Sequence, residues 1–175
     1  MRLSEPRIPA LEESEWNEAQ RELLAPFIER GNVLNIFRTM ANHPDLARRW
    51  MVFANHILGK STLDIREREL VILRIGDQHV LIARAAGMSD EEIRSCRTGP
   101  DTPGLSELDR LLLKATDELH ADAHVSDATW QALEKHLSRQ QMMDLVFTVG
   151  QYNLVSMALN SFGVQADEGL PGWDV

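Results

Sequence analysis

The sequence predicts an all-α fold, and three observations lead to that prediction. Apolar residues recur at helical spacing along most of the 175 residues, whereas the alternation typical of strands, bounded by turn residues, does not occur. Ser and Asp residues suited to helix N-caps precede several of these periodic segments. Only one connection, RTGPDTPG at residues 97–104, is dense in Gly and Pro. A chain of this length can bury about 70% of its unfolded surface, so we predict one domain over residues 1–175.

The first predicted helices are delimited by breakers. One helix begins near residues 12–14 and runs toward Pro26 or slightly beyond, because a proline disfavours an unbroken helix. Gly31 ends that region, and a short helix over residues 33–41 follows. The next helix, over residues 46–58, is predicted from Asp45 as its N-cap and from Gly59 as its stop, and Asp64 caps the helix after it.

Capping patterns also place the helices of the second half. Ser89 with Glu92 forms a capping box that starts a short helix ending near Cys96, and residues 105–120 are amphipathic. Ser126 caps a helix through residue 133. A further capping box at Ser138 and Gln141 starts a helix over residues 139–162. That last helix is apolar around much of its circumference, so we predict that it is central and buried on several sides.

Composition excludes several classes of function. The net charge of −9, from 27 acidic and 18 basic residues, disfavours binding to nucleic-acid phosphates. One cysteine, Cys96, rules out an internal disulfide and a Cys-x-x-Cys site, which suits a reducing compartment. The N-terminal sequence MRLSEPRIPALEE lacks the apolar stretch of a signal peptide, and no run approaches the ~20 apolar residues of a membrane span. We therefore predict a soluble cytoplasmic protein without nucleic-acid or membrane partners.

Four segments carry a family resemblance. They are DIRERELVILRIGDQHVLIARAAG at residues 64–87, NIFRTMANHPDL at 35–46, FANHILG at 53–59 and VGQYNLVSMALNSFGVQ at 149–165. Together they resemble the carboxymuconolactone decarboxylase family, which includes alkylhydroperoxidase-D-like thiol peroxidases. The resemblance implies an all-α alkylhydroperoxidase-D-like bundle, assembly into homotrimers or homohexamers, and a small-molecule substrate bound near subunit contacts. It implies no cofactor.

The chain departs from the family pattern between Ile75 and Gln78. Family members hold roughly nine or ten more residues there, including the Cys-x-x-Cys pair of the peroxidase branch or the acidic and aromatic segment of the decarboxylase branch. What matches is Glu69 and His79, ten residues apart here and about nineteen in the family. In one straight helix they would lie ~15 Å apart along the axis and about 80° apart around it. They could meet only if the chain breaks at Gly76 or if the pair forms between subunits.

His79 is the leading candidate for a catalytic group, because histidine donates and accepts protons near neutral pH. The alternative is an ordinary histidine partnered by Asp77 or water. Glu69 could orient or deprotonate a partner, but it lies in the sequence RERE, where charges on a solvated helix face are the commoner explanation.

Four further residues are candidates for substrate binding. His56 lies in an apolar segment, Gln78 precedes His79, and Tyr152 with Asn153 interrupts the apolar final helix. A satisfied, partly buried histidine is the alternative for His56, and hydrogen bonds between helices are the alternative for the polar residues of the final helix.

A metal site is not predicted. His120 and His124 stand four residues apart, but a third ligand is not evident nearby, and zinc sites need three or four. Cys96 lacks a resolving cysteine and is predicted to be unreactive.

The sequence supports three hypotheses of function. The first is a carboxymuconolactone-decarboxylase-like enzyme that transfers protons without a cofactor on a lactone or related carbonyl acid, with His79 as acid or base. The second is a non-catalytic oligomeric ligand-binding or scaffold protein of the same fold. The third, a thiol peroxidase, is opposed by the missing cysteine pair.

Overall fold

The structure is a computed structural model that describes residues 3–76 and 79–167. Over these residues the chain forms helices and no strand, which confirms the all-α prediction. The chain forms two compact units, one of residues 3–56 with 155–167 and the other of residues 57–154 without 77–78. In the described ranges no helix combines the length and the apolar character needed to cross a bilayer.

The first unit contains a short 3-10 turn and the N-terminal helices. They are the turn Glu13–Glu15, α1 Glu18–Glu29, α2 Asn35–Met40, most of α3 Pro44–Gly59 and the last turns of α9 Arg139–Phe162. A small apolar core holds this unit together, formed by Trp16, Leu23, Leu24, Ala41 and Ala47.

Two predicted helix starts in this unit are wrong. The first long helix begins at Glu18 rather than at residues 12–14, because the Asn17 side chain accepts a hydrogen bond from the N–H of Gln20 and caps the helix there. The third helix begins at Pro44 rather than at residue 46. Proline suits a first helical position, because its missing N–H would have no partner there anyway.

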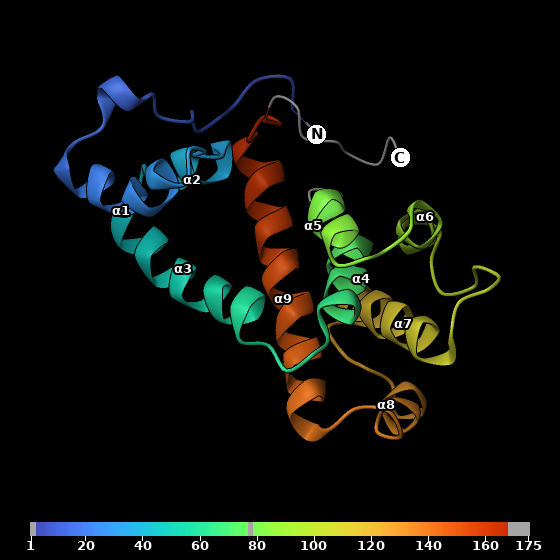
Figure 1. The fold of residues 1–175 in the computed structure, drawn as a ribbon. Coiled ribbons are helices and arrows are strands. Elements are labelled where there is room, and N and C mark those ends of the chain that lie inside the picture. The colour runs from blue at the N-terminus through green and yellow to red at the C-terminus, as the bar shows by residue number, and fades with distance from the viewer. Residues whose placement is uncertain (1–2, 77–78, 168–175) are drawn as a thin grey trace. The chain divides into compact units, whose positions relative to one another are not determined.

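The second unit is built around α4. It contains α4 Ile65–Ile75, α5 Val80–Ala85, α6 Asp90–Thr98, α7 Glu107–Asp122, α8 Asp127–Leu133 and most of α9 (Figure 1). Helix α4 packs against α5, α6 and α7, and α7 packs against α8. Four consecutive residues of α4, Leu70 to Leu73, are almost completely buried, so this helix is apolar on every side over its central turn. The predicted capping boxes at Ser89 and Ser138 are confirmed.

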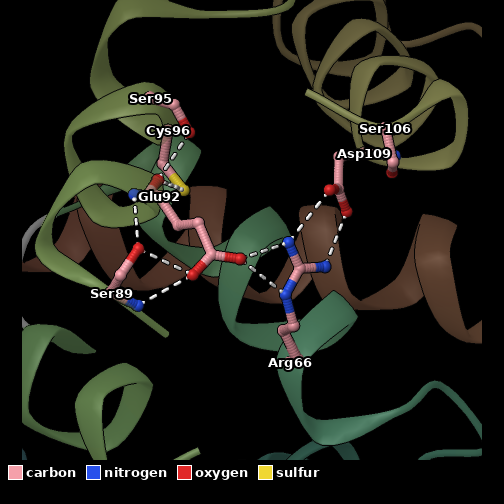
Figure 2. A network of polar contacts seen from close by, with 7 residues as sticks. All are labelled: Arg66, Ser89, Glu92, Ser95, Cys96, Ser106 and Asp109. Carbon is pink, nitrogen blue, oxygen red and sulfur yellow. Dashed lines mark hydrogen bonds and ion pairs between the residues drawn. The ribbon is translucent and has the colours of Figure 1, made fainter. Parts of the chain in front are cut away.

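A network of charged groups ties α4 to α6 and α7 (Figure 2). The Arg66 guanidinium donates to Oε1 of Glu92 at 3.0 and 2.7 Å and to the two carboxylate oxygens of Asp109 at 2.7 and 2.9 Å. Burial opposes ionisation of Asp109, but hydrogen bonds from Arg66 and Ser106 outweigh it and hold the pKa of Asp109 below its usual range. One arginine thus fixes three helices of this unit.

Helix α4 ends at Ile75, and the backbone of the next residue, Gly76, is extended with φ −162° and ψ 158°. The N–H of Gly76 still donates to the carbonyl of Ile72 and closes the last turn. His79 then serves as the N-cap of α5, so the chain from α4 to α5 is two helices and not one (Figure 1).

The prediction that α9 is buried on several sides is only partly met. Leu145 and Val149 are buried, but Met143 is 60% and Leu154 is 52% exposed. One row of apolar side chains on this helix therefore lies at the surface.

Candidate functional site

Glu69 and His79 are in direct contact. Oε2 of Glu69 lies 2.6 Å from Nδ1 of His79. The break in the helical path at Gly76, whose backbone is extended, makes this contact possible within one chain, since the two residues would lie too far apart in one straight helix. Of the two arrangements that could bring these side chains together, the structure has the break in the chain.

The Glu69 side chain has no exposed surface, so the interpretation of this residue as part of a solvated charged face is wrong. The reason is its place on α4, where it directly precedes the fully buried run from Leu70 to Leu73. A carboxylate is buried at this depth only when other groups compensate its charge and fill its hydrogen-bonding positions.

Arg68 supplies that compensation. Its Nε and Nη2 donate to Oε1 of Glu69 at 3.1 and 2.9 Å, and its Nη1 donates to the backbone carbonyl of Leu58 at 2.7 Å. The Arg68 side chain is itself 9% exposed. Glu69 therefore presents one oxygen to Arg68 and the other to His79, and the guanidinium is held in place by the end of α3.

Tyr152 from α9 occupies the other nitrogen of His79. The Tyr152 hydroxyl lies 2.8 Å from Nε2, and the two rings meet edge to face with centroids 4.9 Å apart. Burial, and then the negative charge of Glu69, raise the pKa of the Tyr152 phenol far above its usual range. The phenol is therefore protonated at neutral pH.

The hydrogen-bonding directions follow from the chemistry of the groups. An ionised carboxylate can only accept, so Nδ1 of His79 carries the proton toward Glu69. In neutral imidazole Nε2 is then an acceptor, and the Tyr152 hydroxyl donates to it. The result is a chain from Glu69 through His79 to Tyr152, the arrangement in which a carboxylate orients an imidazole for proton transfer.

The remaining predicted residues lie elsewhere or are engaged differently. Asn153 is the neighbour of Tyr152, but its Oδ1 lies 2.6 Å from Nδ1 of His120, so it links α9 to α7. His56 belongs to the first unit and is exposed. Gln78 is outside the described residues. A substrate-binding role for these three residues stays a prediction.

Arg68 is the member of the site that the sequence did not single out. Arg68 lies in the charged run RERE, which as a whole resembles a solvated helix face. The last two residues of this run are buried, whereas the first two are only partly buried. The available signal was the run ELVIL that begins at Glu69, since four successive apolar residues indicate a helix buried all round.

The structure also places the paired histidines and the cysteine that the sequence singled out. In residues 3–76 and 79–167 no three His, Cys, Asp or Glu side chains are grouped as a metal ion would require. Helix α7 ends at Asp122, so His120 and His124 do not share a continuous helix. Cys96 is buried, donates to the carbonyl of Glu92 at 3.2 Å, and has its pKa raised to about 12 by burial.

Comparison with known proteins identified the fold. No family model matches the sequence, and the curated proteins gave no match either. Among solved structures, an uncharacterised peroxidase-related protein from Ralstonia eutropha JMP134, described as an alkylhydroperoxidase AhpD core, superimposes with a TM-score of 0.80 at 18% identity over 94% of both chains.

Two further solved structures are similar to this chain. A peroxidase-related protein from Silicibacter sp. TM1040 gives a TM-score of 0.76 at 14% identity over 96% of both chains. A protein of unknown function from Agrobacterium tumefaciens, described as a putative antioxidant defence protein AhpD, gives 0.68 at 22% identity over 73% of this chain and 94% of its own. At these identities the likeness establishes the fold, which is alkylhydroperoxidase-D-like as predicted.

Proposed function

We propose that this chain of alkylhydroperoxidase-D-like fold is a lyase of the carboxymuconolactone decarboxylase type, acting without a cofactor on an acidic lactone or a related carbonyl acid. The observation that carries the proposal is the 2.6 Å contact between the buried Glu69 carboxylate and Nδ1 of His79. A carboxylate so placed fixes the tautomer and orientation of the imidazole, which is what general acid–base catalysis needs.

The proposed reaction needs one proton. The bond between the substrate carbon and its carboxylate breaks, CO₂ leaves, and the electron pair passes into the conjugated lactone carbonyl. A protonated His79 is the source of the proton that the remaining carbon takes up, and solvent restores the proton to His79. The positive imidazolium beside Glu69 is stabilised by the carboxylate throughout.

Thiol peroxidase activity is not proposed, although two of the similar structures are described as peroxidase-related. Thiol peroxidases attack with a thiolate and need a second thiol to complete the cycle. Cys96 is the chain's one cysteine, and burial keeps it protonated by raising its pKa to about 12.

The test is turnover by the purified protein on a panel of carboxylated γ-lactones, followed by CO₂ release. Removing the imidazole in His79→Ala should lower kcat by about 10²- to 10⁴-fold, the usual contribution of a general acid or base. His136→Ala is the matched control, because His136 is exposed and follows α8. Wild-type turnover that survives unchanged in His79→Ala would contradict the proposal.

A second candidate function is binding without catalysis, in an oligomeric ligand-binding or scaffold protein. It is favoured by the engagement of both ring nitrogens of His79, which leaves no free nitrogen for a substrate in the observed arrangement. This candidate predicts saturable binding of a lactone acid by calorimetry with no CO₂ released. Turnover by the purified protein would exclude it.

A further inference from the structure

His79 has no free ring nitrogen. Nδ1 is bonded to Glu69 at 2.6 Å and Nε2 to the Tyr152 hydroxyl at 2.8 Å. A proton can therefore pass directly between His79 and a substrate only if one of these contacts breaks. The Glu69 contact is buried and braced by Arg68, so any direct route would have to displace Tyr152.

We propose that the Tyr152 hydroxyl is the group that exchanges the proton with the substrate, and that His79 acts behind it as the proton reservoir. This inference rests on the proposed function and adds a catalytic residue to it. It also changes the role predicted for Tyr152 from substrate binding alone to chemistry.

The Tyr152 hydroxyl can both donate and accept a hydrogen bond, which proton exchange with a substrate requires. A phenol has one O–H donor and two acceptor lone pairs. With neutral His79 the hydroxyl donates to Nε2 and its oxygen can accept a proton from outside. With protonated His79 the Nε2–H donates to the oxygen, and the hydroxyl hydrogen is free to point to a substrate. Both directions of transfer use the observed 2.8 Å contact, without rotation of either ring.

Exposure along the chain of groups fits this order. The Glu69 side chain is fully buried, the His79 side chain is 14% exposed, and Tyr152 is partly buried. Only the outer two groups can therefore meet a molecule that arrives from solvent, and one of them, His79, already has both nitrogens engaged.

Each proton in the proposed step can be followed from His79 through Tyr152 to the substrate carbon. After CO₂ has left, a C–H bond forms at the substrate carbon and the O–H bond of Tyr152 breaks. The Nε2–H of protonated His79 passes to the Tyr152 oxygen, which restores the phenol. His79 is left neutral with Nδ1–H on Glu69 and regains its proton from solvent.

The experiment uses the fact that Tyr152 is the chain's single tyrosine. Growth on 3-fluorotyrosine or 3,5-difluorotyrosine therefore changes this phenol alone and lowers its intrinsic pKa in steps. If the Tyr152 proton moves during turnover, the pH–rate profile should shift to lower pH with each fluorine, and Tyr152→Phe should lower kcat by about 10²-fold. A purely structural tyrosine would leave the profile in place, so unchanged fluorotyrosine profiles or a fully active Tyr152→Phe variant would overturn the inference.

A second measurement decides the matter if the wild-type protein turns over no lactone. The ring carbon signal of labelled Tyr152 and the imidazole signals of His79 are followed by NMR while 5-oxotetrahydrofuran-2-carboxylate is added. A shift of the Tyr152 signal, with a His79 response that disappears in Tyr152→Phe, would support Tyr152 as the contact even though the proposed reaction had failed. A His79 response that persists in Tyr152→Phe, or an unmoved Tyr152 signal, would refute it.

Discussion

Arg68 is the residue on which the buried charge of the candidate site depends. It gives two hydrogen bonds to Glu69 and one to the Leu58 carbonyl, and it is almost as buried as the carboxylate. Because Arg68 touches Glu69 and lies behind His79, we regard it as a positioning residue.

Arg68→Gln should therefore be severely destabilising. Breaking a buried ion pair by removing one partner typically costs about 3–5 kcal/mol, because the other charge stays buried without compensation. The double variant Arg68→Gln, Glu69→Gln should be more stable than Arg68→Gln alone, since no unpaired charge remains. Urea unfolding of both variants measures the difference. A double variant less stable than the single one would show that the charge of Glu69 is compensated in another way.

Cys96 gives a prediction that depends on pH. Burial raises its pKa to about 12 from an ordinary 9.0, so the fold favours the neutral thiol. The stability gained this way is present below the unfolded pKa and is lost as the pH rises from about 9 toward 12. At mildly alkaline pH a chromogenic disulfide reagent should react with Cys96 at the rate of unfolding, and rapidly once guanidinium is added. Fast labelling of the native protein would contradict the prediction.

The residues of the candidate site could in part be predicted from residue types, but their pairing could not. A histidine and a glutamate could be picked out by resemblance, and Tyr152 and Asn153 by their interruption of an apolar helix. The pairing could not be predicted, because it depends on the direction that the chain takes after Gly76. The partner of Asn153 is His120, 33 residues away, and nothing local in the sequence specifies such a contact.

At the scale of the helices, the Arg66 network should make stability depend on pH. The pKa of Glu92 is held below its usual range by the Ser89 N–H and Arg66, and that of Asp109 by Arg66 and Ser106 against burial. Groups with depressed folded pKa values stabilise the fold above their unfolded pKa values, and this stability is lost as the pH falls through the folded values.

Asp109→Asn should therefore cost about 2 kcal/mol at neutral pH, the scale of hydrogen bonds to a charged group. The cost should shrink in acid, where the wild-type carboxylate is protonated as well. Chemical unfolding of both proteins at several pH values checks this. A difference in stability that is the same at all pH values would show that the charge of Asp109 contributes nothing.

Two glycines at helix ends should respond differently to alanine. The backbone of Gly76 is extended and a Cβ there would meet open space, so Gly76→Ala should change stability by less than about 0.5 kcal/mol and leave the His79 contact intact. Gly99 has φ +113°, and a Cβ there would lie 3.1 Å from Nη2 of Arg74, which Asp117 holds in place. Gly99→Ala should cost about 1–3 kcal/mol. Thermal unfolding of the two variants provides the comparison, and equal melting temperatures would contradict it.

Most helix boundaries could be predicted because the signals are local. Ser89, Ser126 and Ser138 each accept or exchange hydrogen bonds with a residue three positions on, which is a pattern visible in the sequence. The start of α1 was misplaced, because the glutamates before Asn17 favour a helix by composition yet form only a 3-10 turn. Cap geometry outweighed propensity at that point.

At the scale of the whole molecule, assembly and domain number remain predictions. The resemblance implies homotrimers or homohexamers, so light scattering should give three or six times the 19.8 kDa of one chain. A single domain should unfold in one transition that is the same by circular dichroism and by tryptophan fluorescence. Separate transitions for the two probes would indicate that the two compact units are independent domains.

The net charge of −9 leads to a prediction about how kcat/KM depends on ionic strength. A protein with a charge of −9 repels an anionic lactone over several ångströms, and salt screens such repulsion with a Debye length of about 8 Å at physiological strength. If the substrate is an acid, kcat/KM should rise with ionic strength while kcat stays constant. A neutral lactone ester provides the control, because its kcat/KM should not respond.

The pairing of Arg68 with Glu69 then matters for a molecule approaching from solution. The two charges cancel within one turn of α4, so the innermost part of the candidate site adds almost nothing to the overall negative field. An anion that has passed the net negative charge of the molecule meets a pair whose charges cancel, and a protonated His79 beside this pair would attract it. If the substrate is an acid, the paired Glu69 carboxylate beside His79 should therefore not repel it.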